Sequence, residues 1–214
     1  MSSLSDLVLI VVVLTNLTLL GSSRMRSCIR QVAVQGVVIG LLALMVSQHG
    51  FSFRLSLVAI ASVTLKGYVI PKLLFRSLRN ANVRHEVQPA VGFAASVVVG
   101  VVLLGLSFWM ASRVTLPFDP VSSLVLPVGL ATILCGLFLI ITRKQALTQV
   151  VGYLVLENGV SIFGIALAHQ EPLLVEMGIL LDVFVAVFAM GIAIFHISRE
   201  FDDIDVEQLA QLRD

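Results

Sequence analysis

The chain has 214 residues, of which 58% are hydrophobic and 13% are charged, and its mean hydropathy is +1.03. Soluble domains carry about 25% charged residues, so this composition excludes a water-soluble globular protein and indicates a polytopic membrane protein. The formal net charge of +1 does not suggest a nucleic-acid partner, and Cys28 and Cys135 lack the spacing of a metal or haem site.

Seven stretches are long and apolar enough to cross the hydrocarbon core, which takes about 20 residues of α-helix. In chain order they are residues 4–20, 29–46, 55–75, 89–111, 121–142, 146–168 and 172–197. The apolar runs are continuous rather than alternating, which favours helices over a membrane barrel. We therefore predict an all-α integral membrane protein with seven transmembrane helices.

Basic residues are distributed unevenly between the two sides of this arrangement. One side carries Arg24, Arg26, Arg30, Lys72, Arg76, Arg79, Arg84, Arg143, Lys144, Arg199 and Arg213, and the other side carries only Arg54 and Arg113. The positive-inside rule then predicts an external N-terminus and a cytoplasmic C-terminus. We divide the chain into a four-helix part (1–112), a three-helix part (113–197) and a cytoplasmic tail (198–214).

Four Asp, Glu, Lys or Arg residues lie in the predicted spans at least four residues from either end: Lys66, Glu157, Glu176 and Asp182. A charge at the bilayer centre costs about 2.5–3.5 kcal/mol on insertion scales, so such residues are functional candidates. The helix rise puts three of them near the midplane, and Glu176 about one turn from the outer interface. Either Lys66 and one acid form a structural ion pair, or the remaining acid takes up and releases protons as a relay. We favour the relay.

Polar residues surround the acid of the sixth span. Tyr153 and Ser161 lie one turn before and after Glu157 on the same helix face. Asn158 is expected to hydrogen-bond a neighbouring helix, although such a stripe is also typical of helix packing. His169, at the end of this span, is a candidate for a proton exit.

Other small and polar residues predict helix contacts. Asn16, Gln31 and Gln35 are expected to make interhelical hydrogen bonds, and the G-x-x-x-G pattern of Gly36 and Gly40 predicts a close helix contact. Near Lys66, Gly67 and Pro71 predict a local opening of the third helix around the charge.

Three segments together resemble component E of the hydrogenase-4 family. They are Arg143-Lys144 followed by Gly152-Tyr153-Leu154-Val155-Leu156-Glu157-Asn158-Gly159, then 172–179 with Glu176 and the later Asp182, and finally Thr64-Leu65-Lys66 with Val69-Ile70-Pro71. The tail sequence Ile204-Asp205-Val206 fits the same family. The resemblance covers nearly the whole chain.

The resemblance implies a membrane-arm subunit of a group 4 membrane-bound [NiFe]-hydrogenase or formate hydrogenlyase complex in the cell inner membrane. Such a chain is a non-catalytic subunit without its own cofactor, and its partners carry the [NiFe] centre and the iron–sulfur clusters. The implied partners are antiporter-like membrane subunits, a complex I H-type membrane subunit, and the large and small hydrogenase subunits. The last three spans resemble the complex I K subunit and the antiporter C subunit.

The first acid of the K subunit falls on Leu154 in this register, whereas the acid of this chain is Glu157, about one turn further. We expect the chain to couple redox chemistry in a partner arm to proton or sodium translocation through Lys66, Glu157 and Asp182. The alternatives are a purely structural subunit that joins the arm to antiporter-like subunits, or a stand-alone ion transporter.

Overall fold

The computed structural model describes residues 2–46, 63–80, 91–114, 122–167 and 191. These residues form helices α1 (Ser2–Gly21), α2 (Met25–Val46), η2 (Leu65–Val69), α4 (Ile70–Asn80), α5 (Phe93–Ala111), α6 (Val125–Thr142) and α7 (Ala146–Leu167). The described part of the chain contains no β-strand, so the predicted all-α class is confirmed.

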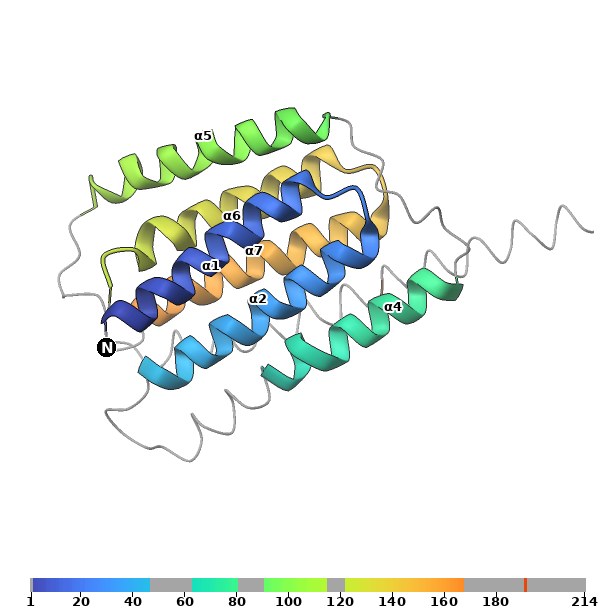
Figure 1. Cartoon of the computed structure of the whole chain (residues 1–214), viewed down its shortest axis with the longest axis horizontal. Coiled ribbons are helices and arrows are strands. Elements are labelled where there is room, and N and C mark those ends of the chain that lie inside the picture. The colour runs from blue at the N-terminus through green and yellow to red at the C-terminus, as the bar shows by residue number, and fades with distance from the viewer. Residues whose placement is uncertain (1, 47–62, 81–90, 115–121, 168–190, 192–214) are drawn as a thin grey trace, which may run out of the picture.

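The helices form one antiparallel bundle (Figure 1). Helices α1, α4 and α6 run in one direction, and α2, α5 and α7 run in the other. The pair α6–α7 is most extensively packed, and α1 and α2 lie against it. Helix α5 flanks the bundle beside α1 and α6, and α4 flanks the opposite side beside α2. The alternating directions are those of a chain that crosses a membrane repeatedly.

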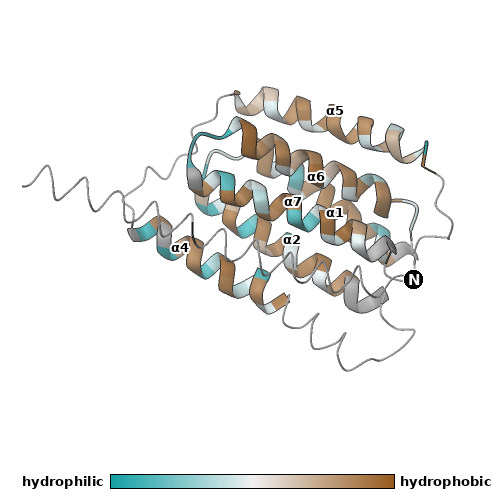
Figure 2. Cartoon of the chain, turned by 180° about the vertical axis from the view of Figure 1, so that it is seen from behind, coloured by the Kyte–Doolittle hydropathy of each residue, from teal (hydrophilic) through white to brown (hydrophobic). Residues whose placement is uncertain are grey.

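Within the described residues, four segments are long and apolar enough to span a membrane: Leu4–Gly21, Met25–Leu42, Phe93–Ala111 and Val125–Thr142. Helix α7 also has 22 residues but contains Glu157 and Asn158. In Figure 2, α5 and α6 are almost entirely hydrophobic, while hydrophilic residues recur along α4. The predicted span 172–197 lies outside the described residues apart from Gly191.

Several helix boundaries differ from the predicted apolar runs. Helix α2 begins at Met25 rather than at residue 29, and α4 continues to Asn80 rather than ending at 75. Both extensions contain arginines, whose long side chains can reach water from a helix that continues past the hydrocarbon. Helix α5 begins only after its N-cap Gly92, so it starts four residues later than residue 89.

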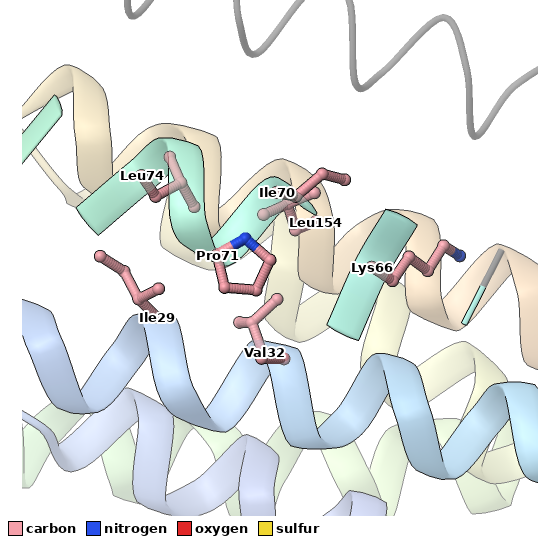
Figure 3. A pocket seen from close by; sticks show the side chains of 8 residues that line it. Ile29, Val32, Lys66, Ile70, Pro71, Leu74 and Leu154 are labelled. Atoms are coloured by element: carbon pink, nitrogen blue, oxygen red, sulfur yellow. The ribbon is translucent and has the colours of Figure 1, made fainter. Parts of the chain in front are cut away.

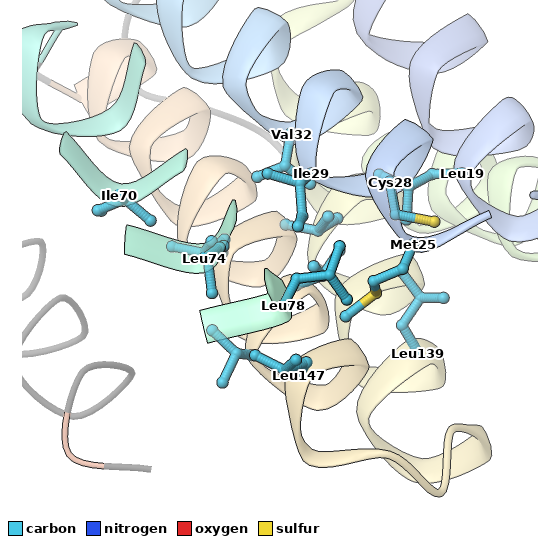
Figure 4. Close-up of a cluster of buried hydrophobic side chains, with 14 of the residues drawn as sticks. Leu19, Met25, Cys28, Ile29, Val32, Ile70, Leu74, Leu78, Leu139 and Leu147 are labelled. Carbon is cyan, nitrogen blue, oxygen red and sulfur yellow. The ribbon is translucent and has the colours of Figure 1, made fainter. Parts of the chain in front are cut away.

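Two clusters of buried apolar side chains occupy the two ends of the bundle. The cluster nearer the α1–α2 and α6–α7 turns, here called the turn-end cluster, is drawn in Figure 4. It comprises Leu19, Leu20, Met25, Cys28, Ile29, Val32, Ile70, Leu74, Leu78, Cys135, Leu139, Leu147, Val150, Val151, Leu154 and Val155. The far-end cluster comprises Leu9, Val12, Ile39, Leu42, Val125, Val128 and Ile162.

A polar layer separates these two clusters. Four helices each place a buried polar residue between their contributions to the two clusters: Asn16 in α1, Gln35 in α2, Thr132 in α6 and Glu157 in α7. Lys66, from η2, is buried one turn before the cluster residue Ile70. The polar groups, Lys66 and Glu157 among them, therefore lie in the middle of the bundle, between the two apolar clusters.

Glycines let α6 and α7 approach until their main chains touch. Gly129 and Gly136 on α6 are seven residues apart, as are Gly152 and Gly159 on α7. A Cβ atom at Gly136 would lie 2.4 Å from the main-chain nitrogen of Leu156, and small residues at a helix interface permit such close approach. A seven-residue repeat keeps the contact on one seam of a left-handed crossing.

Candidate functional site

The centre of the polar layer is an ion pair between Lys66 and Glu157. The Lys66 Nζ and Glu157 Oε1 atoms are 2.5 Å apart, and the two side chains are only 7% and 1% exposed. Lys66 Nζ also donates a hydrogen bond of 3.0 Å to Ser161 Oγ, one turn further along α7. A charge pair of this kind in the middle of apolar helices is a candidate functional site.

A π-helical turn and a proline shape the segment that carries Lys66. The Ile70 N–H bonds to the Leu65 carbonyl, five residues back, so the helix widens by one residue at the lysine. Such π turns are rare and are frequent at functional sites. Pro71 follows at once and lacks an N–H, so one carbonyl in the turn before it has no helical donor. The predicted opening of the helix next to Gly67 and Pro71 is therefore present.

Helix α2 supports Lys66 from the other side through its glycines. A Cβ atom at Gly36 would lie 2.9 Å from Lys66 Cβ, and one at Gly40 would collide with the side chain of Val63. The predicted close contact of the G-x-x-x-G pattern is therefore the contact between α2 and the Lys66 segment. The lysine stem lies against bare α2 main chain, and its ammonium extends toward α7.

The α7 residues predicted to surround Glu157 make different contacts. Ser161 contacts the lysine, and Asn158 donates a 3.2 Å hydrogen bond to Gln35 Oε1 on α2, which is the predicted interhelical bond. Tyr153 is half-buried one turn before Glu157. Glu176, Asp182 and His169 lie outside the described residues, so their place relative to the ion pair stays a prediction.

A chain of buried amides continues from Asn158 across the bundle. Gln35 Nε2 donates to Asn16 Oδ1 at 2.8 Å, and Asn16 Nδ2 donates to Thr132 Oγ1 at 2.9 Å. The interhelical bonds predicted for Asn16 and Gln35 are therefore present. Contrary to the prediction, Gln31 makes no hydrogen bond to another helix in the described part of the chain, since its amide donates to Ser27 Oγ on the same helix.

A narrow cleft beside the site is apolar (Figure 3). It lies between α2, α4 and α7, and Pro71, Leu154 and the Lys66 stem contribute to its wall. The Lys66 ammonium points away from the other labelled residues of the cleft. Leu154, where the resemblance to the K subunit places that subunit's first acid, is a core residue here.

Arg143 is a buried cation, although the charge pattern predicts no more of it than a place on the cytoplasmic side. Its guanidinium donates to the Leu20 carbonyl at 2.9 Å and lies over the Phe93 ring, 5.1 Å from its centroid. Burial lowers the pKa of Arg143 from its ordinary value, yet arginine stays protonated in proteins. It lies just past α6 and at the end of α1, where two helix C-termini stabilise a positive charge.

The polar groups described at the site carry charge and exchange hydrogen bonds. Among the described residues, no group of three or more His, Cys, Asp or Glu side chains is placed to hold a metal ion. Cys28 and Cys135 are both buried and free. The groups brought together are an ammonium, a carboxylate, a hydroxyl and neutral amides.

Comparison with known proteins gives matches over most of the chain. Residues 124–214 match the family described as NADH-ubiquinone/plastoquinone oxidoreductase chain 4L. The uncharacterized protein Rv0085 of Mycobacterium tuberculosis is 30% identical over 203 residues, which cover 94% of this chain and 92% of the relative. Hydrogenase-4 component E of Escherichia coli is 28% identical over 148 residues, covering 69% and 68% of the two chains. No solved structure matches significantly.

Proposed function

This chain belongs to the same family as Rv0085 and hydrogenase-4 component E, and from that premise we propose that it is an energy-coupling membrane subunit of a complex I-related respiratory complex. In this proposal, redox chemistry in a partner arm drives the movement of protons, or of sodium ions, through a polar axis. The axis comprises Lys66, Glu157 and Asp182.

The observation that carries the proposal is the buried Lys66–Glu157 pair. A proton that moves onto Glu157 neutralises the carboxylate and removes the negative charge that faces the ammonium, which still donates to Ser161. The pair therefore has a charged state and a broken state that differ by one proton, and a change in a neighbouring subunit can shift the balance between them. Asp182 is the proposed next carrier.

The proposal includes a topology and a set of partners. We place the N-terminus outside and the C-terminus in the cytoplasm, with seven spans in the cell inner membrane. The partners are antiporter-like membrane subunits, a complex I H-type membrane subunit, and hydrogenase large and small subunits. Those last subunits would contain the [NiFe] centre and the iron–sulfur clusters.

A structural role is the second candidate. An ion pair that only holds α7 against the Lys66 segment, here called a brace, would have the same geometry. The two roles differ in what they require of the charges. Replacing a buried ion pair by apolar residues of similar volume is often neutral for stability. A brace therefore tolerates the double variant Lys66→Met/Glu157→Met, whereas a relay does not.

The test uses the assembled complex in liposomes, with a soluble electron carrier for hydrogen chemistry and a pH-sensitive dye for proton movement. We expect Glu157→Gln and the double methionine variant to keep hydrogen chemistry and to lose pumping, and Asp182→Asn to resemble them. Lys144→Gln, at an exposed position, is the control. If the double methionine variant assembles and pumps like the parent, the structural role is correct.

A further inference from the structure

The amide chain that begins beside Glu157 has a fixed direction, which follows from its last member. Thr132 Oγ1 lies 2.7 Å from the Val128 carbonyl, and because a carbonyl cannot donate, the hydroxyl must donate there. Its oxygen is then an acceptor toward Asn16, at 2.9 Å. Asn16 must therefore present its N–H₂ group to Thr132 and its oxygen to Gln35.

The same reasoning orients the remaining two amides. Gln35 donates to the Asn16 oxygen, so its own oxygen faces Asn158 and accepts from that residue's N–H₂ group. Every donor in the chain points from α7 toward α6, and the four side chains are at most 4% exposed. Such a fully buried chain is rigid, because reversing one amide would break its neighbours' hydrogen bonds.

Proton transfer along this chain is chemically blocked. Carboxylates, imidazoles, amines and thiols titrate in proteins, but Asn and Gln side chains do not. An amide can donate and accept hydrogen bonds but has no protonation state to exchange near neutral pH. The three consecutive amides of Asn158, Gln35 and Asn16 therefore separate a titratable group from Thr132 without carrying its proton.

A second acid, Asp6, lies on the α6 side of the bundle, so a block to proton transfer between α7 and α6 separates two titratable groups. Asp6 of α1 accepts a hydrogen bond of 2.5 Å from Ser122, just before α6. Thr132 lies seven residues beyond Val125, the first residue of α6, or about 10 Å at the helical rise. Acids therefore lie on both sides of the amide chain, Asp6 beside the start of α6 and Glu157 on α7.

We propose that the amide chain Asn158–Gln35–Asn16–Thr132 is a proton barrier that isolates the Lys66–Glu157 pair from α1 and α6. The pair then exchanges protons only on its other side, where the Lys66 segment lies. This inference rests on the proposed coupling function, since only a pair that exchanges protons needs such insulation.

The test converts the amides to carboxylates of nearly the same shape. Complexes with Asn16→Asp/Gln35→Glu/Asn158→Asp are reconstituted in liposomes without electron donor, and passive proton entry is measured with a trapped pH-sensitive dye under a valinomycin-set potassium diffusion potential. All three amides are replaced because one remaining amide would still block the chain. The matched control is Asn16→Leu/Gln35→Met/Asn158→Leu, which removes the same hydrogen bonds without adding a titratable group. If the triple carboxylate variant does not assemble, Asn16→His/Gln35→Glu/Asn158→His is compared with the same apolar control.

We expect passive proton entry to rise severalfold in the carboxylate variant and to stay at the parental rate in the apolar variant. Parental entry in the carboxylate variant overturns the barrier, as does equal entry in both variants, which would mean that packing alone limits proton entry. The coupling function itself is judged separately, by redox-driven pumping of Glu157→Gln.

Discussion

Gly36 is the point where the Lys66 side chain crosses α2, so Gly36→Ala tests how the ion pair is held. The added Cβ would lie 2.9 Å from Lys66 Cβ and 3.5 Å from Lys66 Cδ, whereas ordinary contacts are 3.4–4 Å. Because Lys66 Cβ is bonded directly to the main chain, rotating the lysine does not relieve the clash. The whole segment must move away by about 0.5–1 Å to reach normal carbon–carbon contact.

Gly36→Ala lowers the free energy of unfolding through overpacking and a longer ion pair, and raises it slightly because alanine favours the helix. Overpacking costs about 1–3 kcal/mol, and alanine in a helix gains about 0.5–1 kcal/mol over glycine. Lengthening the 2.5 Å ion pair by about 1 Å weakens its attraction by about 2 kcal/mol at an effective dielectric constant of about 20. The net loss is about 2–4.5 kcal/mol, which for a chain of this size lowers Tm by about 4–18 °C.

Thermal unfolding of the purified complex checks this estimate, with a fluorescent protein fused to the C-terminus of the chain and the intact fraction read by size-exclusion chromatography. Gly105→Ala in α5 and Gly164→Ala in α7 are matched controls, because a Cβ at either position meets nothing within 4 Å. Both should unfold at or slightly above the parental temperature. If Gly36→Ala has the same midpoint as Gly105→Ala, α2 does not hold the lysine in place.

Further predictions concern the charges and the topology. Lys66→Met leaves Glu157 buried without its cation, at a cost of about 3–5 kcal/mol, so immunoblots of purified membranes should show less assembled complex; parental amounts would contradict this. Arg143→Lys removes the planar guanidinium that donates to the Leu20 carbonyl and lies over the Phe93 ring, at a cost of about 1–3 kcal/mol. The same thermal assay should therefore give a lower unfolding midpoint. An unchanged midpoint would show that these two contacts do not stabilise the bundle. Impermeant maleimide should label Ser2→Cys from outside and Asp214→Cys only from the cytoplasmic side; labelling of both from one side is incompatible with seven spans. The purified chain alone, in liposomes, should move no ions at a useful rate, and a fast ion flux would favour a stand-alone transporter.

The position of Lys66 and Glu157 along their helices could be predicted from the sequence, but the contact between them could not. Counting along each span puts Lys66 and Glu157 at one level, because the helix rise is fixed. The count does not say which way a helix faces in the bundle. It therefore left open which acid meets the lysine, and the 2.5 Å contact with Glu157 answers this for the described residues.

The amide chain shows the same limit at the level of single hydrogen bonds. Gln31 and Gln35 are one turn apart on α2 and look equivalent in the sequence. Gln31 has Ser27 one turn before it as an acceptor within its own helix, whereas Gln35 faces α1 and α7. Thr132 gave no signal at all, because a threonine whose hydroxyl bonds the carbonyl four residues back is common in membrane helices.

The glycine seam between α6 and α7 bears on which half of the ion pair can move. Main chain touches main chain there, so turning α7 would drive the two backbones into each other. We therefore expect Glu157 to keep its position and the lysine, on a helix interrupted by a π turn and Pro71, to be the more displaceable charge. A neighbouring subunit that moves α4 would therefore open and close the pair. A subunit bound to the exposed face of α5 would not, because α5 packs on α1 and α6 and not on the Lys66 segment.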